Sequence, residues 1–296
     1  MDLSIWANIP QGFPPRPFRI TYSRFGAAIN TVPNNELPNK ELTNAELPNS
    51  ELPANSHPGD GSPPVPAPPT AEELKRLAGP LGIEGIDDLA WKNLARYCGL
   101  AWDWNTKINL TRHTTPELFV QRDLLDSYQL SKLLQPNEEI LDLGTGGGVP
   151  GILLAILRPD LDVSLCDSVA KKAKVAQDIV KKLGLNVRVF PMSATNVLDE
   201  ERFDTIVARG VGPLVRLCGW LKEEWHKIGR LLAIKGPRWV EERGEARHRG
   251  MLQGLQLRRM VAYPMPGTES ESVILQVART SSPFALKPPE GTEDVL

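Results

Sequence analysis

The stretch "ILDLGTGGGVPGILLAIL", residues 140–157, decides the fold. The apolar run that ends at Leu143 predicts a buried strand, and the apolar run after Pro150 predicts a helix. Four closely spaced glycines between them predict a tight loop whose backbone a ligand can approach closely. A glycine-rich loop between a strand and a helix is typical of folds that bind a nucleotide-like cofactor.

Strand and helix patterns alternate along the chain after Pro136. The expected strands are 139–143, 162–166, 186–190, 203–208 and 229–234, and the expected helices are 150–158, 168–183 and 213–227. Such alternation predicts parallel strands joined by right-handed crossovers. The last two strands, 255–263 and 272–278, have only "PMPGTES" between them, which is too short for a crossover, so they should pair antiparallel.

The fold class that follows is α/β and Rossmann-like. We expect a mostly parallel seven-stranded sheet with an antiparallel last strand, which is the plan of class I S-adenosylmethionine-dependent methyltransferases. Apolar residues at helical spacing, interrupted at Gly79-Pro80, predict a small helical lead-in before the sheet, with Thr70 as its N-cap. A further amphipathic helix is expected over 116–134.

Composition divides the 296 residues into four parts. Residues 1–70 hold about half of the 27 prolines and the pentapeptide repeat "ELPNKELTNAELPNSELPA" (36–54), so we interpret them as a disordered tail. The helical lead-in spans 71–135, the methyltransferase domain spans 136–280, and 281–296 reads as a flexible tail.

Three well-separated cysteines, Cys98, Cys166 and Cys218, lie in apolar surroundings, which indicates reduced core thiols and a cytoplasmic protein. The histidines show no paired ligand spacing, so we expect no metal. No run approaches the ~18 apolar residues of a membrane span, and no signal pattern is visible. A net charge of -2 argues against a generally polycationic nucleic-acid binder, although local basic patches are compatible with it.

The glycine loop itself supports two interpretations. Gly146, Gly148 and Gly151 match the dinucleotide fingerprint, with Asp167 at the distance of a ribose-binding acid. The alternative is the first methyltransferase motif, which begins at Asp142. A carboxylate at Asp142 would repel a pyrophosphate, whereas it would attract the ammonium and sulfonium of S-adenosylmethionine. Charge therefore favours S-adenosylmethionine as the cofactor.

Several ordered motifs then resemble one family, the small-subunit ribosomal RNA guanine-N7 methyltransferases, also called the glucose-inhibited division protein B family. The resemblance runs from about Trp102 to Arg279. Its motifs are "WNTKINLT" (104–111), "RDLLDS" (122–127), "DLGTGGGVPGI" (142–152), "LCDSVAKK" (165–172), "FDTIVARGVGPL" (203–214) and "AIKG" (233–236).

The resemblance implies methylation of N7 of a guanine in 16S ribosomal RNA, with the 30S subunit or an assembly intermediate as partner and a monomeric enzyme. It also implies the cofactor-binding residues, which are Gly144, Gly146, Val149, Asp167, Thr195, Asn196 and Arg209. Of these, Asp167 takes the ribose, and Thr195 and Asn196 flank the adenine. The chain departs from the family at Ala194-Thr195-Asn196, where Arg-Ala-Glu is usual, and at Asp123, where histidine is usual.

Guanine N7 is an unprotonated lone pair at neutral pH, so in-line transfer needs alignment and no general base. We therefore expect no catalytic acid or base. RNA would be held by local positive charge, and the candidates near the expected site are Lys107, Arg112, Arg122, Lys171, Lys172, Arg209, Lys235 and Arg238. Trp102 and Trp104 are better explained by core packing than by base stacking, and residues 241–249 by a charged helix face.

Three other functions remain as alternatives at this point. The first is a methyltransferase for a small molecule or a protein on the same fold. The second is a nicotinamide oxidoreductase, which Asp142 and the antiparallel ending disfavour. The third is a non-catalytic scaffold that retains a cofactor pocket and works through its proline-rich arm.

Overall fold

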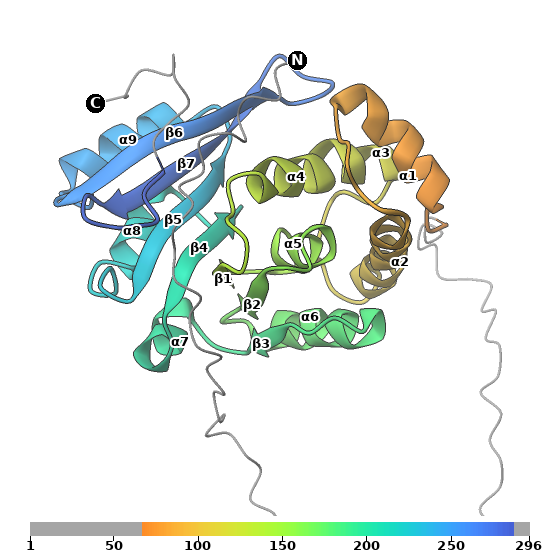
Figure 1. Ribbon diagram of the computed structural model, residues 1–296, viewed down its shortest axis with the longest axis horizontal. Coiled ribbons are helices and arrows are strands. Elements are labelled where there is room, and N and C mark those ends of the chain that lie inside the picture. The colour runs from red at the N-terminus through yellow and green to blue at the C-terminus, as the bar shows by residue number, and fades with distance from the viewer. Residues whose placement is uncertain (1–66, 287–296) are drawn as a thin grey trace, which may run out of the picture. The chain divides into compact units, whose positions relative to one another are not determined.

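The computed structural model describes residues 67–286 (Figure 1). The expected tail 1–66 with its repeat, and residues 287–296, lie outside the described residues. The helical elements are α1 (Ala71–Ala78), η2 (Gly79–Leu81), α2 (Asp88–Asn105), α3 (Pro116–Leu118), η3 (Phe119–Leu124), α4 (Leu125–Ser131), α5 (Gly151–Leu157), α6 (Ala170–Leu183), α7 (Ala194–Glu200), α8 (Leu214–Trp220) and α9 (Trp239–His248). The strands are β1 (Glu139–Leu143), β2 (Asp162–Cys166), β3 (Arg188–Phe190), β4 (Phe203–Arg209), β5 (Ile228–Lys235), β6 (Leu255–Pro264) and β7 (Glu271–Arg279).

The strands form one seven-stranded sheet in the order β3-β2-β1-β4-β5-β7-β6. Strands β1 to β5 pair parallel, and β7 runs antiparallel to both β5 and β6. The predicted fold class is therefore confirmed. Strand β7 runs opposite to its neighbours, because the short link between β6 and β7 permits only an antiparallel pair.

Helices cover both faces of the sheet (Figure 1). On β1, Ile140 belongs to the core shared with α1, α2, α4, α5 and α6, whereas Leu141 belongs to the core shared with α7, α8 and α9. This alternation follows from the two-residue period of a strand. Both faces are buried, which explains why the central strands read as continuous apolar runs in the sequence.

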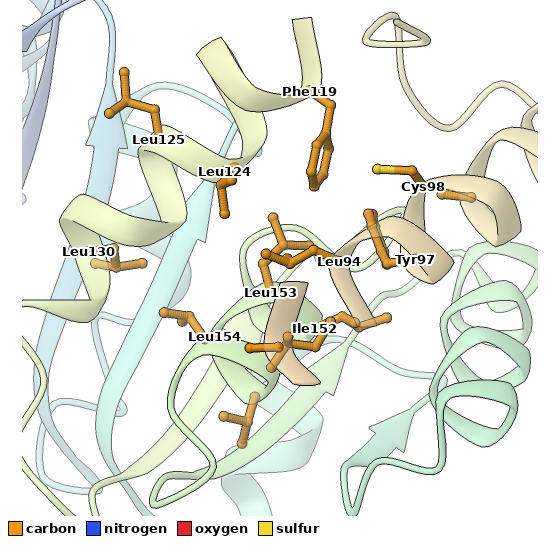
Figure 2. Packing of buried hydrophobic residues seen from close by; sticks show 14 of the residues in the cluster. Leu94, Tyr97, Cys98, Phe119, Leu124, Leu125, Leu130, Ile152, Leu153 and Leu154 are labelled. Carbon is orange, nitrogen blue, oxygen red and sulfur yellow. The ribbon is translucent and has the colours of Figure 1, made fainter. Parts of the chain in front are cut away.

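The N-terminal helices pack directly into the first of these cores. Thr70 caps α1 as predicted, its side chain accepting the Glu73 backbone N–H at 3.1 Å. Figure 2 shows Tyr97 of α2 and Phe119 of η3 beside Leu153 of α5; the Tyr97 and Phe119 ring centroids lie 6.0 Å apart. The helical lead-in therefore shares its hydrophobic core with the sheet.

Some element boundaries differ from the sequence prediction. The helix expected over 116–134 is divided, because a π-helical segment, η3, separates α3 from α4. The helix expected over 213–227 ends at Trp220, after Gly219 weakens its last turn. Helix α7 was not predicted, although Ser193 caps it by accepting the Asn196 backbone N–H.

Residues 281–286, at the start of the expected C-terminal tail, lie against the sheet. Leu286 donates its backbone N–H to Gln276 Oε1 at 2.9 Å, and Ser282 donates to the Gly229 carbonyl at 2.6 Å. Across residues 67–286, no helix combines the length and the apolar character needed to cross a bilayer.

Candidate cofactor-binding site

The glycine loop lies at the carboxyl ends of β1 and β2. Gly144 and Thr145 both donate their backbone N–H groups to the Cys166 carbonyl, at 2.9 and 3.0 Å, so the loop folds over the end of β2. Gly144 has φ +69°, and a Cβ atom there would come within 3.0 Å of both Val211 methyls. Glycine is therefore required at this position for its conformation and for the close approach of the loop after β4.

Asp142 closes the base of the loop. Its Oδ2 accepts the Thr145 hydroxyl at 2.6 Å and the Gly151 backbone N–H at 2.9 Å, so it caps the N-terminus of α5. That terminus is where a dinucleotide would place its pyrophosphate, and the carboxylate occupies it. The geometry therefore excludes the dinucleotide mode of binding at this loop.

The other oxygen of Asp142, Oδ1, is buried and has no hydrogen-bond partner within residues 67–286. Burial raises the pKa of Asp142 to about 6, and the bonds from Thr145 and Gly151 oppose that rise. A buried acceptor left open is costly unless a ligand supplies a partner or a positive charge. The residues of the loop thus fit a cationic, nucleoside-containing cofactor better than an anionic one.

Asp167 follows β2 and is fixed by two backbone donors. Its Oδ2 accepts the Gly146 N–H at 2.9 Å and its Oδ1 accepts the Val169 N–H at 2.8 Å. The Gly146 contact joins two of the predicted site residues directly. Each carboxylate oxygen keeps a lone pair, so the side chain remains able to accept a hydroxyl.

The remaining predicted residues lie along the same edge of the sheet. Val149 is half-buried at the end of the glycine loop. Thr195 and Asn196 stand in the first turn of α7, which follows β3; the Thr195 hydroxyl lies 2.8 Å from Ser193 Oγ, and Asn196 is exposed. No hydrogen bond joins Thr195 or Asn196 to the glycine loop among the described residues. They lie on the same side of the sheet as the loop only because α7 follows β3 as the loop follows β1.

Arg209 ends β4 beside the loop, since its neighbour Ala208 pairs with Leu143. Its Nε donates to Asp126 Oδ2 at 2.7 Å, and its Nη2 lies 2.8 Å from Asp123 Oδ1. Burial by itself would lower the pKa of Arg209, but the two carboxylates outweigh it and raise the pKa above its ordinary value. The guanidinium therefore stays charged, and it is tethered to the "RDLLDS" segment.

The sequence analysis assigned no role to two kinds of residue around this site. Tyr97 of α2 donates its hydroxyl to the Gly147 carbonyl at 2.9 Å, which ties the lead-in helices to the loop. Nothing local distinguished it from a core aromatic. Asp123 and Asp126 could have been found, because a spacing of three puts both carboxylates on one helix face.

The predicted RNA-holding residues divide into two groups. Lys235 is buried, where it donates to the Gly212 carbonyl and pairs with Glu242 at 2.8 Å. Arg122 donates to the Pro266 carbonyl at 3.1 Å. The prediction of Lys235 as a free RNA contact is wrong, because the side chain is buried and its donors serve the fold. Arg122 is half-buried, and its contact with RNA stays a prediction. Arg112 and Lys171 are exposed and make no ion pair within the described part of the chain.

Glu242 also departs from the expected charged helix face. It accepts the Leu214 backbone N–H at 2.8 Å and so caps α8 while it pairs with Lys235. Trp102 is buried and donates to the His113 carbonyl, and Trp104 donates to Asp178 at 2.7 Å. Both tryptophans therefore serve packing, as predicted, and all three cysteines are buried.

The strand order and the glycine loop together define the class of protein. A sheet ordered 3-2-1-4-5-7-6 with an antiparallel seventh strand is the class I fold of S-adenosylmethionine-dependent methyltransferases, and its cofactor site lies at the carboxyl edge of the parallel strands. The described site has this geometry, and S-adenosylmethionine is the methyl donor of the class.

Comparison with known proteins gives the family. Residues 90–268 match the GidB family model, described as rRNA small subunit methyltransferase G. A protein of that name from Rhodopirellula baltica is 49% identical over 199 residues, which are 67% of this chain and 86% of that protein. Its namesake from Clostridium novyi is 30% identical and covers 71% of this chain and 91% of that protein. The chain belongs to the rRNA small subunit methyltransferase G family, and its substrate is therefore an RNA.

Solved structures are more distant. The structure of M. capricolum TrmK in complex with S-adenosyl-homocysteine aligns with a TM-score of 0.42 and 16% identity, over 52% of this chain and 67% of that one. The fold assignment rests on the strand order and not on this likeness.

Proposed function

We propose that the protein transfers the methyl group of S-adenosylmethionine to N7 of a guanine in 16S ribosomal RNA, acting on the 30S subunit or an assembly intermediate. The observation that carries this proposal is the family match over residues 90–268, which includes the whole glycine loop. We further propose that the enzyme is a monomer and works in the cytoplasm, where ribosomal subunits are assembled.

The proposed cofactor contacts are Gly144, Gly146, Val149, Asp167, Thr195, Asn196 and Arg209. Gly144 and Gly146 let the cofactor approach the backbone, and Asp167 accepts the ribose hydroxyls. Thr195 and Asn196 flank the adenine at the start of α7. Support comes from the shared carboxyl edge and from the bond between Gly146 and Asp167.

The bound cofactor supplies an electrophilic methyl group on a sulfonium. Guanine N7 would accept this methyl group with its own lone pair as the sulfur–methyl bond breaks and S-adenosylhomocysteine leaves, so the protein's task is to align the base and to exclude water. No residue is required to remove a proton from N7. The three cysteines are also unsuited to act as nucleophiles, because burial raises the pKa of each thiol, to about 12 for Cys166 and Cys218.

The experiment is methyl transfer from labelled S-adenosylmethionine to 30S subunits purified from cells that lack the endogenous enzyme. Gly144→Asp should abolish transfer, because a side chain there meets Val211. Gly250→Asp is the matched control, since Gly250 also has positive φ, of +67°, but faces open space. Borohydride and aniline treatment, which cleaves RNA at N7-methylguanosine, should give one cleavage site in 16S RNA.

Wild-type enzyme that binds S-adenosylmethionine but labels neither subunits nor naked 16S RNA would reject the RNA target. Label that resists the cleavage treatment would reject N7 as the acceptor atom. Sedimentation at micromolar concentration tests the monomer, which a dimer mass would contradict.

A further inference from the structure

The Arg209 side chain is held on two sides by carboxylates from one helical segment. Nε is bound by Asp126 and Nη2 by Asp123, and two contacts on neighbouring nitrogens fix the plane of a guanidinium. The third nitrogen, Nη1, makes no hydrogen bond within residues 67–286. Because the side chain is 19% exposed, one donor-bearing face of Arg209 is left open.

Each of these two carboxylates is held in turn by a residue from elsewhere in the chain. The Tyr263 hydroxyl, on β6, donates to Asp126 Oδ1 at 2.6 Å. Burial and the nearby Asp126 charge raise the pKa of Tyr263, so its hydroxyl keeps its proton and remains a donor. Asp126 therefore cannot turn away from Arg209 without breaking a short bond to a buried tyrosine.

The partner of Asp123 is His113, in the link between α2 and α3. Its Nδ1 lies 2.8 Å from Asp123 Oδ1, and Nδ1 must donate because a carboxylate only accepts. The same oxygen also contacts Arg209. His113 thus restrains Asp123 at the atom that holds the guanidinium.

This cluster borders the glycine loop. Arg209 follows Ala208, whose strand partner is Leu143, so Arg209 and Gly144 leave the sheet side by side. Burial raises the pKa of the Asp142 carboxylate, and the nearby Arg209 charge opposes that rise. The orientation of Arg209 is therefore set within reach of the loop by residues from three separate segments.

We propose that Tyr263 and His113 are positioning residues that fix the Arg209 guanidinium, through Asp126 and Asp123, in the orientation that receives S-adenosylmethionine. The open Nη1 group is suited to an anionic or carbonyl oxygen of the cofactor, such as its amino-acid carboxylate. The inference rests on the proposed role of Arg209 in cofactor binding, and it adds residues that touch neither cofactor nor RNA.

The test is calorimetric titration of the full chain with S-adenosylmethionine. Tyr263→Phe removes only the hydroxyl, and we expect Kd to rise about tenfold, as for loss of one hydrogen bond to a charged group. Tyr128→Phe is the matched control. The Tyr128 hydroxyl bonds the Glu84 backbone at 3.1 Å and has no hydrogen bond to Arg209, Asp123 or Asp126 in the described part of the chain, so its removal should leave Kd unchanged.

His113 allows a test by conservative rescue. His113→Ala should raise Kd for S-adenosylmethionine severalfold. His113→Asn should restore it, because an asparagine amide places a donor near the position of Nδ1. His226→Ala is the control, since the His226 ring hydrogen-bonds only to the Glu223 carbonyl among the described residues. Affinity for 16S RNA should stay the same in all five variants.

The positioning role is overturned if Tyr263→Phe and His113→Ala both keep the cofactor Kd within about twofold of wild type. It is equally overturned if RNA affinity falls in parallel with cofactor affinity, which is the pattern of a general structural defect. Wild-type protein that does not bind S-adenosylmethionine rejects the proposed cofactor role and this inference together. Wild-type protein that binds the cofactor but does not methylate RNA rejects the proposed substrate alone, because the Kd comparison does not depend on transfer.

Discussion

Two arginines lie on neighbouring strands of the sheet, one at the amino edge, where the parallel strands begin, and one at the carboxyl edge, where they end. Both are bound by carboxylates, but they serve different purposes. Arg230 lies near the start of β5 and is fully buried, where it contacts Glu138 at 2.9 Å, the Thr205 hydroxyl at 2.8 Å and the Leu133 carbonyl at 2.8 Å. Arg209 lies at the end of β4 and is 19% exposed. Both are paired with carboxylates, but only Arg209 keeps a face open to a ligand.

The difference shows that the amino edge and the carboxyl edge of the parallel strands have different roles. At the amino edge, Glu138 accepts from Arg230, from the Thr205 hydroxyl and from the Gln135 backbone N–H, so its oxygens are used within the fold. At the carboxyl edge, Asp142 Oδ1 is buried without a hydrogen-bond partner among the described residues, and at the amino edge the same is true of Arg230 Nη1. What separates the two arginines is therefore exposure: Arg230 is fully buried, whereas Arg209 keeps a face that a ligand can reach.

The largest expected effect is at the amino edge. Arg230→Met leaves Glu138 buried without its ion-pair partner, and breaking one side of such a pair costs about 3–5 kcal/mol of folding free energy. Urea denaturation followed by tryptophan fluorescence measures this loss. The folded fraction should bind S-adenosylmethionine with unchanged Kd. A higher Kd, or a loss of folding free energy below about 1 kcal/mol, would contradict the different roles of the two edges.

The next effect is a pH dependence that belongs to Asp142. Its folded pKa of about 6 exceeds the ~3.9 of an unfolded aspartate, so the folded state binds a proton that the unfolded state has released. The contribution of Asp142 to the stability of the free protein should therefore fall by about 3 kcal/mol as pH rises from about 4 to about 6, and level off above. Denaturation of wild type and Asp142→Asn across pH 4–8 measures the difference, and a variant with the same slope would contradict it.

The open oxygen of Asp142 also predicts a coupling to the cofactor. A cationic ligand favours the ionised carboxylate, so affinity for S-adenosylmethionine should rise with pH through about 6. Affinity for S-adenosylhomocysteine, which lacks the sulfonium charge, should rise less. Equal pH profiles for the two ligands would show that Asp142 does not sense the sulfonium.

The fold was predictable from local patterns because its elements are coded locally. The run 139–143, the glycines and the apolar run after Pro150 specify strand, loop and helix without any distant contact. The antiparallel ending followed from one short link between β6 and β7. Helix α7 escaped prediction because its seven residues are recognised mainly by the Ser193 cap.

The site was only half predictable, for a physical reason. Gly144, Gly146 and Asp167 carry their signal in loop chemistry and strand ends, which sequence shows. Tyr263 gave no local signal, because its role depends on the pairing of β6 with β7 and on a bond to Asp126 of α4, 137 residues earlier in the chain. Charge type alone was also insufficient: the sequence predicted Lys235 as an RNA contact, but the structure shows it buried against Glu242.

A smaller effect distinguishes the two arginines directly. Arg209→Lys keeps the charge but cannot hold Asp123 and Asp126 in one plane, so cofactor Kd should rise about tenfold with a stability change near 1 kcal/mol. Arg230→Lys should show the reverse, a larger loss of stability and no change in Kd. Calorimetry and urea denaturation on both variants give the two numbers. Similar behaviour of the pair would mean that Arg209 is a structural residue like Arg230.

The smallest effect concerns two glycines with nearly the same backbone. Gly144 has φ +69° and Gly184, at the end of α6, has φ +70°, but a Cβ at Gly184 meets nothing within 4 Å. Gly184→Ala should cost only the left-handed strain, about 1 kcal/mol. Gly144→Ala adds contact with Val211, so the loop must shift, and cofactor Kd should rise while Gly184→Ala leaves it unchanged. Equal Kd values for the two variants would show that the Gly144 backbone tolerates displacement, and that the carboxyl edge is less closely shaped to its cofactor than its contacts indicate.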